Sequence, residues 1–209
     1  MKNIREQALV WVRLGSFVLI WVAVLYLSQH SLSINWEAVK KLPEVVTIYV
    51  ILSFVFTRWL WRLPLFQGWL VPHPDLEGTW AGALQSTWKE PETNRPKPPI
   101  LILLVIKQSF STISCVLYSK ESTSYSNAAH LSSDRESGAI RLSYNYTNRS
   151  QATIRDRSEI HDGAAILTFV KGPERVLTGE YWTSRKTTGD LQVIFKSKKL
   201  EDGFPVDAI

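Results

Sequence analysis

The densest group of residues that could bind a charged ligand lies between Gly179 and Gly189, in the string GEYWTSRKTTG. Successive side chains of an extended strand point to opposite faces, so Tyr181, Thr183 and Arg185 are expected on one face. An arginine inside a domain requires an acidic partner or an anionic ligand, because an unpaired buried charge is costly. The pattern also fits a simpler arrangement, in which Arg185 lies at the end of the strand and reaches solvent.

Three further residues carry side chains suited to a nucleotide ligand and are weaker candidates: Trp80, Tyr146 and Arg157. Aromatic rings stack on bases, and arginines bind phosphate groups. Each residue also has a structural explanation. The aromatic rings can serve as packing, and Arg157 can belong to a solvated loop.

Signatures of catalysis and of metal binding are absent from the sequence. It contains no H-E-x-x-H, C-x-x-C, G-x-S-x-G or P-loop pattern, and its four histidines show no metal-ligand spacing. We therefore expect no catalytic residue, no metal and no cofactor. A hydrolase whose catalytic residues come from distant positions stays an alternative.

Eight strand-like segments, separated by turn signals, must position the candidate residues. They are 78–88, 100–108, 110–118, 123–132, 139–146, 164–171, 176–183 and 191–197. Short antiparallel strands in this number fit a closed meander barrel, which has no exposed edges, or a two-sheet sandwich. We favour a compact eight-stranded antiparallel β-barrel, whose interior can hold packed side chains or one small ligand.

Two apolar segments precede the β-rich part. Residues 14–27 and 45–57 carry no charged side chain, and with their flanks each reaches the roughly 20 residues that cross a bilayer. We predict two transmembrane α-helices, at 13–33 and 43–63, in an anchor of residues 1–66. A linker at 67–74 and a β-barrel at 75–209 follow. The alternative is a pair of buried core helices.

Lysine and arginine positions set the predicted orientation. Lys2, Arg5 and Arg13 precede the first span, and Arg58 and Arg62 close the second, so both termini are expected in the cytoplasm. Residues 75–209 hold 17 Lys or Arg against 16 Asp or Glu, whereas residues 1–74 hold 7 against 3. The basic excess belongs to the anchor, so binding to long DNA or RNA is not expected.

Several segments together resemble the two-transmembrane, β-strand-rich effectors of bacterial CBASS anti-phage systems. They are LEGTWAGALQSTW (76–88), SYSNAAHLSSD (124–134), GAIRLSYNYTN (138–148), RDRSEIHDGAAIL (155–167) and LTGEYWTSRKTTGDLQV (177–193). The most specific element is the pattern G-x-Y-W-T-x-R-x-T-x-G at 179–189.

The resemblance implies a cytoplasmic β-barrel that binds a cyclic dinucleotide made by a neighbouring CD-NTase. Ligand binding in such effectors is thought to promote homo-oligomerisation, so that the helices disrupt the bacterial inner membrane and kill the infected cell. The residues that we predict to contact the ligand are Arg185, Tyr181 and Thr183, with Trp80, Tyr146 and Arg157 as weaker candidates. The alternative is a membrane-tethered barrel that carries an apolar small ligand and has no signalling role.

Overall fold

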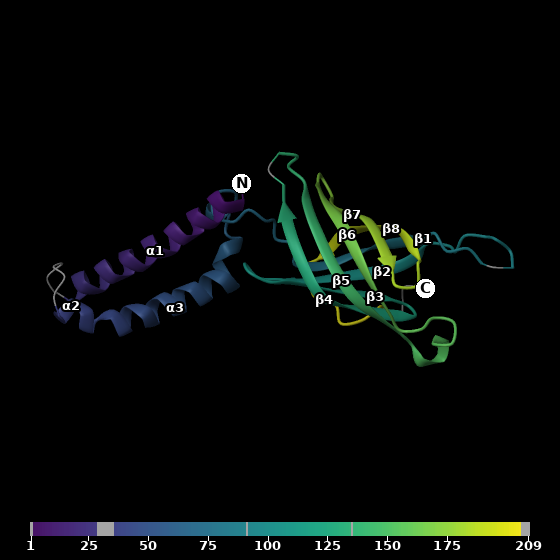
Figure 1. The fold of residues 1–209 in the computed structure, drawn as a ribbon, viewed down its shortest axis with the longest axis horizontal. Helices are drawn as coiled ribbons and strands as arrows, with labels where there is room; N and C mark the ends of the chain where they lie inside the picture. Colours follow the sequence, from purple (N-terminus) through teal and green to yellow (C-terminus); the bar gives the residue numbers. More distant parts are fainter. Residues whose placement is uncertain (1, 29–35, 91, 135, 206–209) are drawn as a thin grey trace. The chain divides into compact units, whose positions relative to one another are not determined.

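The computed structural model describes residues 2–28, 36–90, 92–134 and 136–205. The chain divides into two compact units, Met1–Val71 and Pro72–Ile209. The first unit is helical and the second is a β-barrel (Figure 1).

The helical unit contains α1 (Lys2–Leu27), the short α2 (Trp36–Lys40) and α3 (Leu42–Arg58). Two 3-10 turns, Leu60–Arg62 and Pro64–Phe66, follow α3. A proline disfavours helical backbone at the residue before it, and Leu63 is extended, with φ −64° and ψ 138°. The α-helix itself ends at Arg58, before the predicted boundary of the second span at residue 63, and Leu63 ends the 3-10 turn that follows.

Val10–Leu27 of α1 is the one segment among the described residues that is long and apolar enough to cross a bilayer. The 17 residues of α3 extend about 26 Å at the usual helical rise, less than the roughly 30 Å of a hydrocarbon core. Length and composition thus support one of the two predicted spans. Residues 29–33 of that predicted first span lie outside the described residues.

The helices of this unit pack against each other and expose apolar side chains on their other faces. The rings of Phe17 and Tyr49 meet edge to face with centroids 5.6 Å apart, and the Trp21 indole N–H donates to the Ala38 carbonyl at 3.3 Å. The large exposed apolar residues include Trp11, Leu14, Leu19, Tyr26, Val50, Ile51 and Phe54. Core helices would bury these side chains, so the exposure favours a lipid environment.

The second unit is a closed eight-stranded antiparallel meander in which each strand pairs with its sequence neighbours and β8 closes onto β1. Its strands are β1 (Gly78–Ser86), β2 (Ile100–Gln108), β3 (Ile113–Ser119), β4 (Ser122–Ser133), β5 (Ile140–Ser150), β6 (His161–Lys171), β7 (Arg175–Thr183) and β8 (Thr188–Ser197). The predicted eight-stranded barrel is confirmed, and the alternative sandwich is not formed.

The interior near the start of β1 is an apolar core; we call this part the apolar end. Its fully buried side chains include Trp80, Leu104, Leu142, Leu167, Leu177 and Val193. Burying each such side chain contributes about 1.5–3 kcal/mol of hydrophobic stabilisation. The core leaves this end of the barrel filled by side chains.

Arg175 packs over the aromatic residues of the apolar end. Its guanidinium lies 4.4 Å from the Phe195 ring centroid and 5.2 Å from that of Trp80, and it donates a hydrogen bond to the Asp75 carbonyl. Burial lowers the pKa of Arg175, an effect that the Asp75 carboxylate opposes. Asp75 lies near the start of this unit, so Arg175 attaches the entering chain to the barrel.

The segment after β8 covers part of the outer barrel wall. The Thr79 hydroxyl donates to the Lys199 carbonyl at 2.7 Å and accepts from the Glu201 amide at 3.1 Å. Thr79 pairs with Val105 on β2, and both Val105 and Leu103 are buried although they point outward. The middle of β2, from Ile102 to Ile106, is therefore buried on both faces, whereas Leu101 is exposed on the outer wall.

Candidate ligand-binding site

The opposite end of the barrel interior has a different chemistry. Along β5, the inward residues change from Leu142 through Tyr144 and Tyr146 to Asn148 and Ser150. We call this region the polar end, and it is lined by inward or half-buried residues of β4 to β7: Ser124, Tyr144, Tyr146, Asn148, Ser150, His161, Tyr181 and Thr183. At this end hydrogen-bonding groups replace the aliphatic core, which is the chemistry that a polar ligand requires.

The strand register arranges these side chains in rows across the sheet. Tyr146 lies opposite Gly163, which lies opposite Thr183. Asn148 lies between Ser124 and His161. Its side-chain amide donates to the hydroxyls of Ser122 at 3.0 Å and Ser124 at 2.9 Å. The rim of the polar end is therefore held by a side-chain network.

Two glycines leave room for the tyrosine rings. A Cβ at Gly163 would lie 2.5 Å from Cζ of Tyr146, and a Cβ at Gly189 would lie 2.7 Å from the Tyr181 ring. Such distances are shorter than van der Waals contact, so any larger residue would displace the rings. The sequence thus places small residues on β6 and β8 where aromatic rings of β5 and β7 need space.

The Tyr144 hydroxyl is buried and has no hydrogen-bond partner among the residues that the structure describes. Burial raises the pKa of Tyr144 well above its ordinary value, and the nearby Cys115 and Tyr146 add to the effect. Buried polar groups in folded proteins are almost always hydrogen-bonded, because leaving one unpaired costs about 1–3 kcal/mol. A polar atom of a bound molecule can supply the hydrogen-bond partner that this hydroxyl lacks.

The positive charge of Arg185 acts on the polar end from outside the strand. β7 ends at Thr183, and the turn that follows carries Arg185 with an exposed side chain. Burial, with a contribution from Tyr181, raises the pKa of Tyr146 to about 12, and the Arg185 guanidinium opposes that rise. Arg185 therefore reaches solvent, as the simpler arrangement anticipated, and its field still extends to the interior tyrosines.

His161 adds an imidazole to the rim of the polar end, next to the charge of Arg185. Burial lowers the pKa of His161, and Arg185 lowers it further, while the Glu159 carbonyl and Asp162 act in the opposite direction. Its Nδ1 lies 2.8 Å from the Glu159 carbonyl oxygen. The neutral imidazole is favoured, and an anion bound beside it would favour the imidazolium instead.

Four of the six candidate residues come together at the polar end, one lies in a loop that adjoins it, and one lies at the apolar end. Tyr181, Thr183 and Tyr146 line the interior, and Arg185 lies in the adjoining turn. The remaining two are Trp80 and Arg157. Trp80 is fully buried at the apolar end, where its indole N–H donates to the Leu76 carbonyl at 2.9 Å. Arg157 is exposed in the loop from β5 to β6, which adjoins the polar end, and forms an ion pair with Glu121 at 2.6 Å.

Sequence reasoning missed Tyr144, Asn148 and His161. The alternation in SYNYTN (143–148) places Tyr144, Tyr146 and Asn148 on one face of a strand. That signal was sufficient to add Tyr144 to Tyr146. No local pattern indicates that His161 of β6 lies opposite Asn148 of β5, because the pairing depends on the length of the intervening loop.

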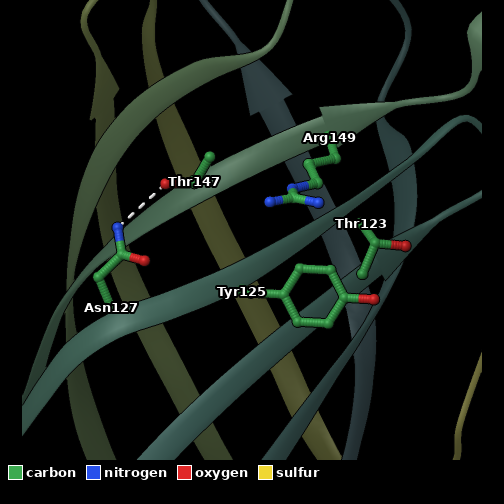
Figure 2. A pocket seen from close by; sticks show the side chains of 5 residues that line it. All are labelled: Thr123, Tyr125, Asn127, Thr147 and Arg149. Atoms are coloured by element: carbon green, nitrogen blue, oxygen red, sulfur yellow. Dashed lines mark hydrogen bonds between the residues drawn. The ribbon is translucent and has the colours of Figure 1, made fainter.

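A shallow groove of about 500 Å³ lies on the outer face of β4 and β5 (Figure 2). It is lined by Thr123, Tyr125, Asn127, Thr147 and Arg149, and the figure shows the Arg149 guanidinium beside the Tyr125 ring. Arg149 makes no hydrogen bond or ion pair with any residue that the structure describes, and the Tyr125 side chain is 49% exposed. These groups are well solvated, so the groove retains a ligand less effectively than the barrel interior.

A closed barrel with an apolar core at one end and convergent polar groups at the other belongs to the class of small antiparallel meander barrels, whose interiors are filled by side chains or hold one small ligand. The chain belongs to the Cap15 family, because the family model of the Cap15 cyclic dinucleotide receptor domain matches residues 71–194. It is similar to the CD-NTase-associated protein 15 of Staphylococcus schleiferi, with 28% identity over 180 residues. That alignment covers 86% of this chain and 91% of the relative. The resemblance to CBASS effectors is thereby confirmed.

Proposed function

We propose that the protein is a CBASS effector that binds a cyclic dinucleotide at the polar end of its barrel and responds by assembling and disrupting the bacterial inner membrane. The receptor-domain family supports the ligand class. The observation that carries the location is the buried Tyr144 hydroxyl, which has no partner among the described residues and lies beside Tyr146. The protein then acts as a receptor and needs neither a catalytic residue nor a cofactor.

The polar end offers the contacts that a cyclic dinucleotide requires. Its two base faces can stack on the tyrosine rings, and each such stack contributes about 1–3 kcal/mol. Its two phosphates are attracted by Arg185 and by a protonated His161. The hydroxyls of Thr183 and Tyr144 supply further hydrogen bonds. An apolar carrier function has less support, because aliphatic side chains already fill the apolar end.

The exposed apolar helices support the membrane part of the proposal. In this proposal α1 crosses the inner membrane, and α3 with its following 3-10 turns makes the second crossing, with both chain ends in the cytoplasm. Local bilayer thinning accommodates a short span at a cost of fractions of a kcal/mol per Å. The ligand drives assembly only if it binds the assembled chains more tightly than the dispersed ones.

Calorimetry on the full chain in detergent micelles tests the ligand class with a panel of cyclic di- and trinucleotides and fatty acids. We expect a cyclic dinucleotide to bind, and Arg185→Ala to weaken that binding about tenfold through loss of a charge-assisted contact. Arg141→Ala is the matched control, because Arg141 is exposed near the start of β5, at the opposite end of that strand from Ser150. Binding of fatty acids alone would support the carrier alternative and contradict the proposal.

Membrane disruption needs a separate measurement in cells that express the full chain. Supplying the bound cyclic dinucleotide should depolarise the inner membrane, and Arg185→Ala should reduce the depolarisation at equal expression. Depolarisation that is independent of any nucleotide would indicate toxicity of overexpression and would contradict the effector step. Such depolarisation would not change the nucleotide binding measured by calorimetry, so the receptor and effector parts of the proposal are tested independently.

A further inference from the structure

Strand β4 extends past its neighbour β3. The two strands pair at three positions, Val116↔Tyr125, Leu117↔Ser124 and Tyr118↔Thr123. Continuing this register places Ile113, the first residue of β3, opposite Ala128. Residues 129–133 therefore lie beyond the start of β3, and their register pairs them with β5 alone.

A local irregularity marks the point where β4 leaves β3. The β4–β5 register shifts between Ser126 and Ala128, which indicates a β-bulge. At the same place the Cys115 amide donates to the Ser126 hydroxyl at 2.9 Å, in place of a backbone carbonyl of the ladder. Beyond this point, no described residue outside β5 forms a backbone hydrogen bond with 129–133. One side of this segment is consequently an open sheet edge.

The open edge lacks the features that usually prevent edge-to-edge pairing. Natural sheets protect their edges with charged residues, especially lysine, or with proline. The sequence of β4, STSYSNAAHLSS, contains no Lys, Arg, Asp, Glu or Pro. Ala128 and His130 are exposed on it, and the small side chain of Ala128 allows close approach. This edge is therefore competent to add a strand.

We propose that the open edge of β4 binds the same edge of a second copy of this chain, in an antiparallel pair related by a two-fold axis. This inference rests on the assembly step of the proposed function and names its surface. An isologous contact satisfies both open edges at once, and two uncharged strands meet without like-charge repulsion. Anchoring both copies in one membrane raises their effective concentration.

The edge lies one strand away from the candidate ligand. Ala129 pairs with Tyr144 and Ser126 pairs with Tyr146, so the two interior tyrosines neighbour the bulge and the open segment. A ligand held by these tyrosines restrains the backbone of β4 where it leaves β3. Ordering an edge before it pairs lowers the entropic cost of association, which couples binding to assembly.

Disulfide cross-linking of the full chain in liposomes tests the interface. Cysteines introduced by Ala128→Cys, His130→Cys and Ser132→Cys sample the outward side of the edge, so that one of them lies near the two-fold axis. Ile166→Cys is the matched control, because Ile166 is also exposed on the outer wall but belongs to β6. The native Cys115 is buried and its pKa is raised to about 12, so it stays unreactive.

On oxidation we expect at least one β4 variant to shift from monomer to disulfide-linked dimer on a non-reducing gel, with Ile166→Cys remaining monomeric. In parallel, Ala128→Lys combined with His130→Lys should shift the full chain from assembled to monomeric in sedimentation, while its calorimetric affinity for cyclic dinucleotide is unchanged. Equal cross-linking at residue 166, no dimer at any β4 position, or normal assembly of the lysine variant would overturn the proposal. Failure of the chain to bind any nucleotide would contradict the proposed function. The interface would then be decided by the cross-linking of the ligand-free chain.

Discussion

The buried hydroxyl of Tyr144 allows the ligand site to be tested with a single atom. Tyr144→Phe removes a group that is unpaired among the described residues, so we expect the stability without ligand to be unchanged or to rise by about 1 kcal/mol. Cyclic dinucleotide affinity should fall about tenfold, as for the loss of one buried hydrogen bond. Thermal unfolding of the full chain with and without ligand measures both effects. A destabilised variant with normal affinity would show that the hydroxyl stabilises the fold and does not contact the ligand.

The pH dependence of the protein should carry a component from His161. The pKa of His161 in the folded chain is lowered by burial and by Arg185. Just below the ordinary histidine pKa of about 6.5, His161 is therefore protonated in the unfolded chain and still neutral in the folded chain. Stability should therefore decline as pH falls below that value, and His161→Gln should remove this part of the decline. Urea unfolding at several pH values measures it. Identical pH profiles for the variant and the wild type would exclude the histidine as the source.

The same residue predicts the pH dependence of ligand binding with the opposite sign. A phosphate beside His161 favours the imidazolium, so a bound anion raises the pKa that burial lowers. Affinity should consequently increase as the pH is lowered through this range, and His161→Gln should flatten the increase. Calorimetry at matched ionic strength separates this effect from general screening.

Among single residues, the sequence correctly predicted the facing direction of those that follow alternation within one strand. Tyr181 and Thr183 share the inward face of β7 as predicted, and Tyr146 faces the same interior from β5. Arg185 departs from that face because β7 ends at Thr183, whose amide and hydroxyl bond Thr187 across a tight turn. Turn formation depends on the partner strand β8, which a single-strand pattern does not contain.

At the scale of elements, the close approach between β5 and β6 makes a prediction about packing. Gly163→Ala would place a Cβ 2.5 Å from the Tyr146 ring and 2.7 Å from the Trp182 carbonyl. We expect a loss of about 1–3 kcal/mol in unfolding free energy, as for other overpacked sites. Gly172→Ala is the control, since its Cβ would meet its nearest atom at an ordinary 3.5 Å. Equal stabilities in chemical denaturation would show that the tyrosine moves without cost.

The strands illustrate which structural signals reside in the sequence. Their number and order follow from apolar alternation and turn residues, and the predicted segments overlap all eight observed strands. The ends at the polar end were placed short of the structure: β5 continues past residue 146 to Ser150, and β6 begins at His161 and not at residue 164. Polar residues face inward there, so the apolar period that defines a buried strand is absent. The same residues that conceal the strand ends line the candidate site.

For the whole molecule, the attachment of the entering chain to the barrel depends on Arg175. Arg175→Leu removes its hydrogen bond to the Asp75 carbonyl and its contacts with the Phe195 and Trp80 rings. Cation–π contacts and charge-assisted hydrogen bonds of this kind predict a loss of about 1–3 kcal/mol. Arg149→Leu, at an arginine without an ion pair among the described residues, should have little effect. Arg175→Lys should recover part of the loss, and chemical denaturation of all three variants measures the difference.

The membrane anchor shows the limit of composition as a guide. Hydropathy and flanking charges predicted two equal spans, and the exposed apolar faces of α1 and α3 agree with a lipid environment. The second helix ends at Arg58 and is followed by a 3-10 turn at Leu60–Arg62 and a second at Pro64–Phe66, so helix length distinguishes the two segments where apolar content does not. The predicted orientation stays a prediction from the positive-inside bias.

Closure of the barrel has a consequence for the order of events during synthesis. β1 can pair on its second side only with β8, through contacts such as Thr79↔Ser197, whereas every other strand pair joins sequence neighbours. The ribosome adds roughly 5–20 residues per second, so β1 waits for several seconds before its last partner emerges. Tyr181, Arg185 and Gly189 of the candidate site are also made late. A nascent or truncated chain that already carries its apolar helices therefore lacks a receptor, and only a completely translated copy can respond to the nucleotide.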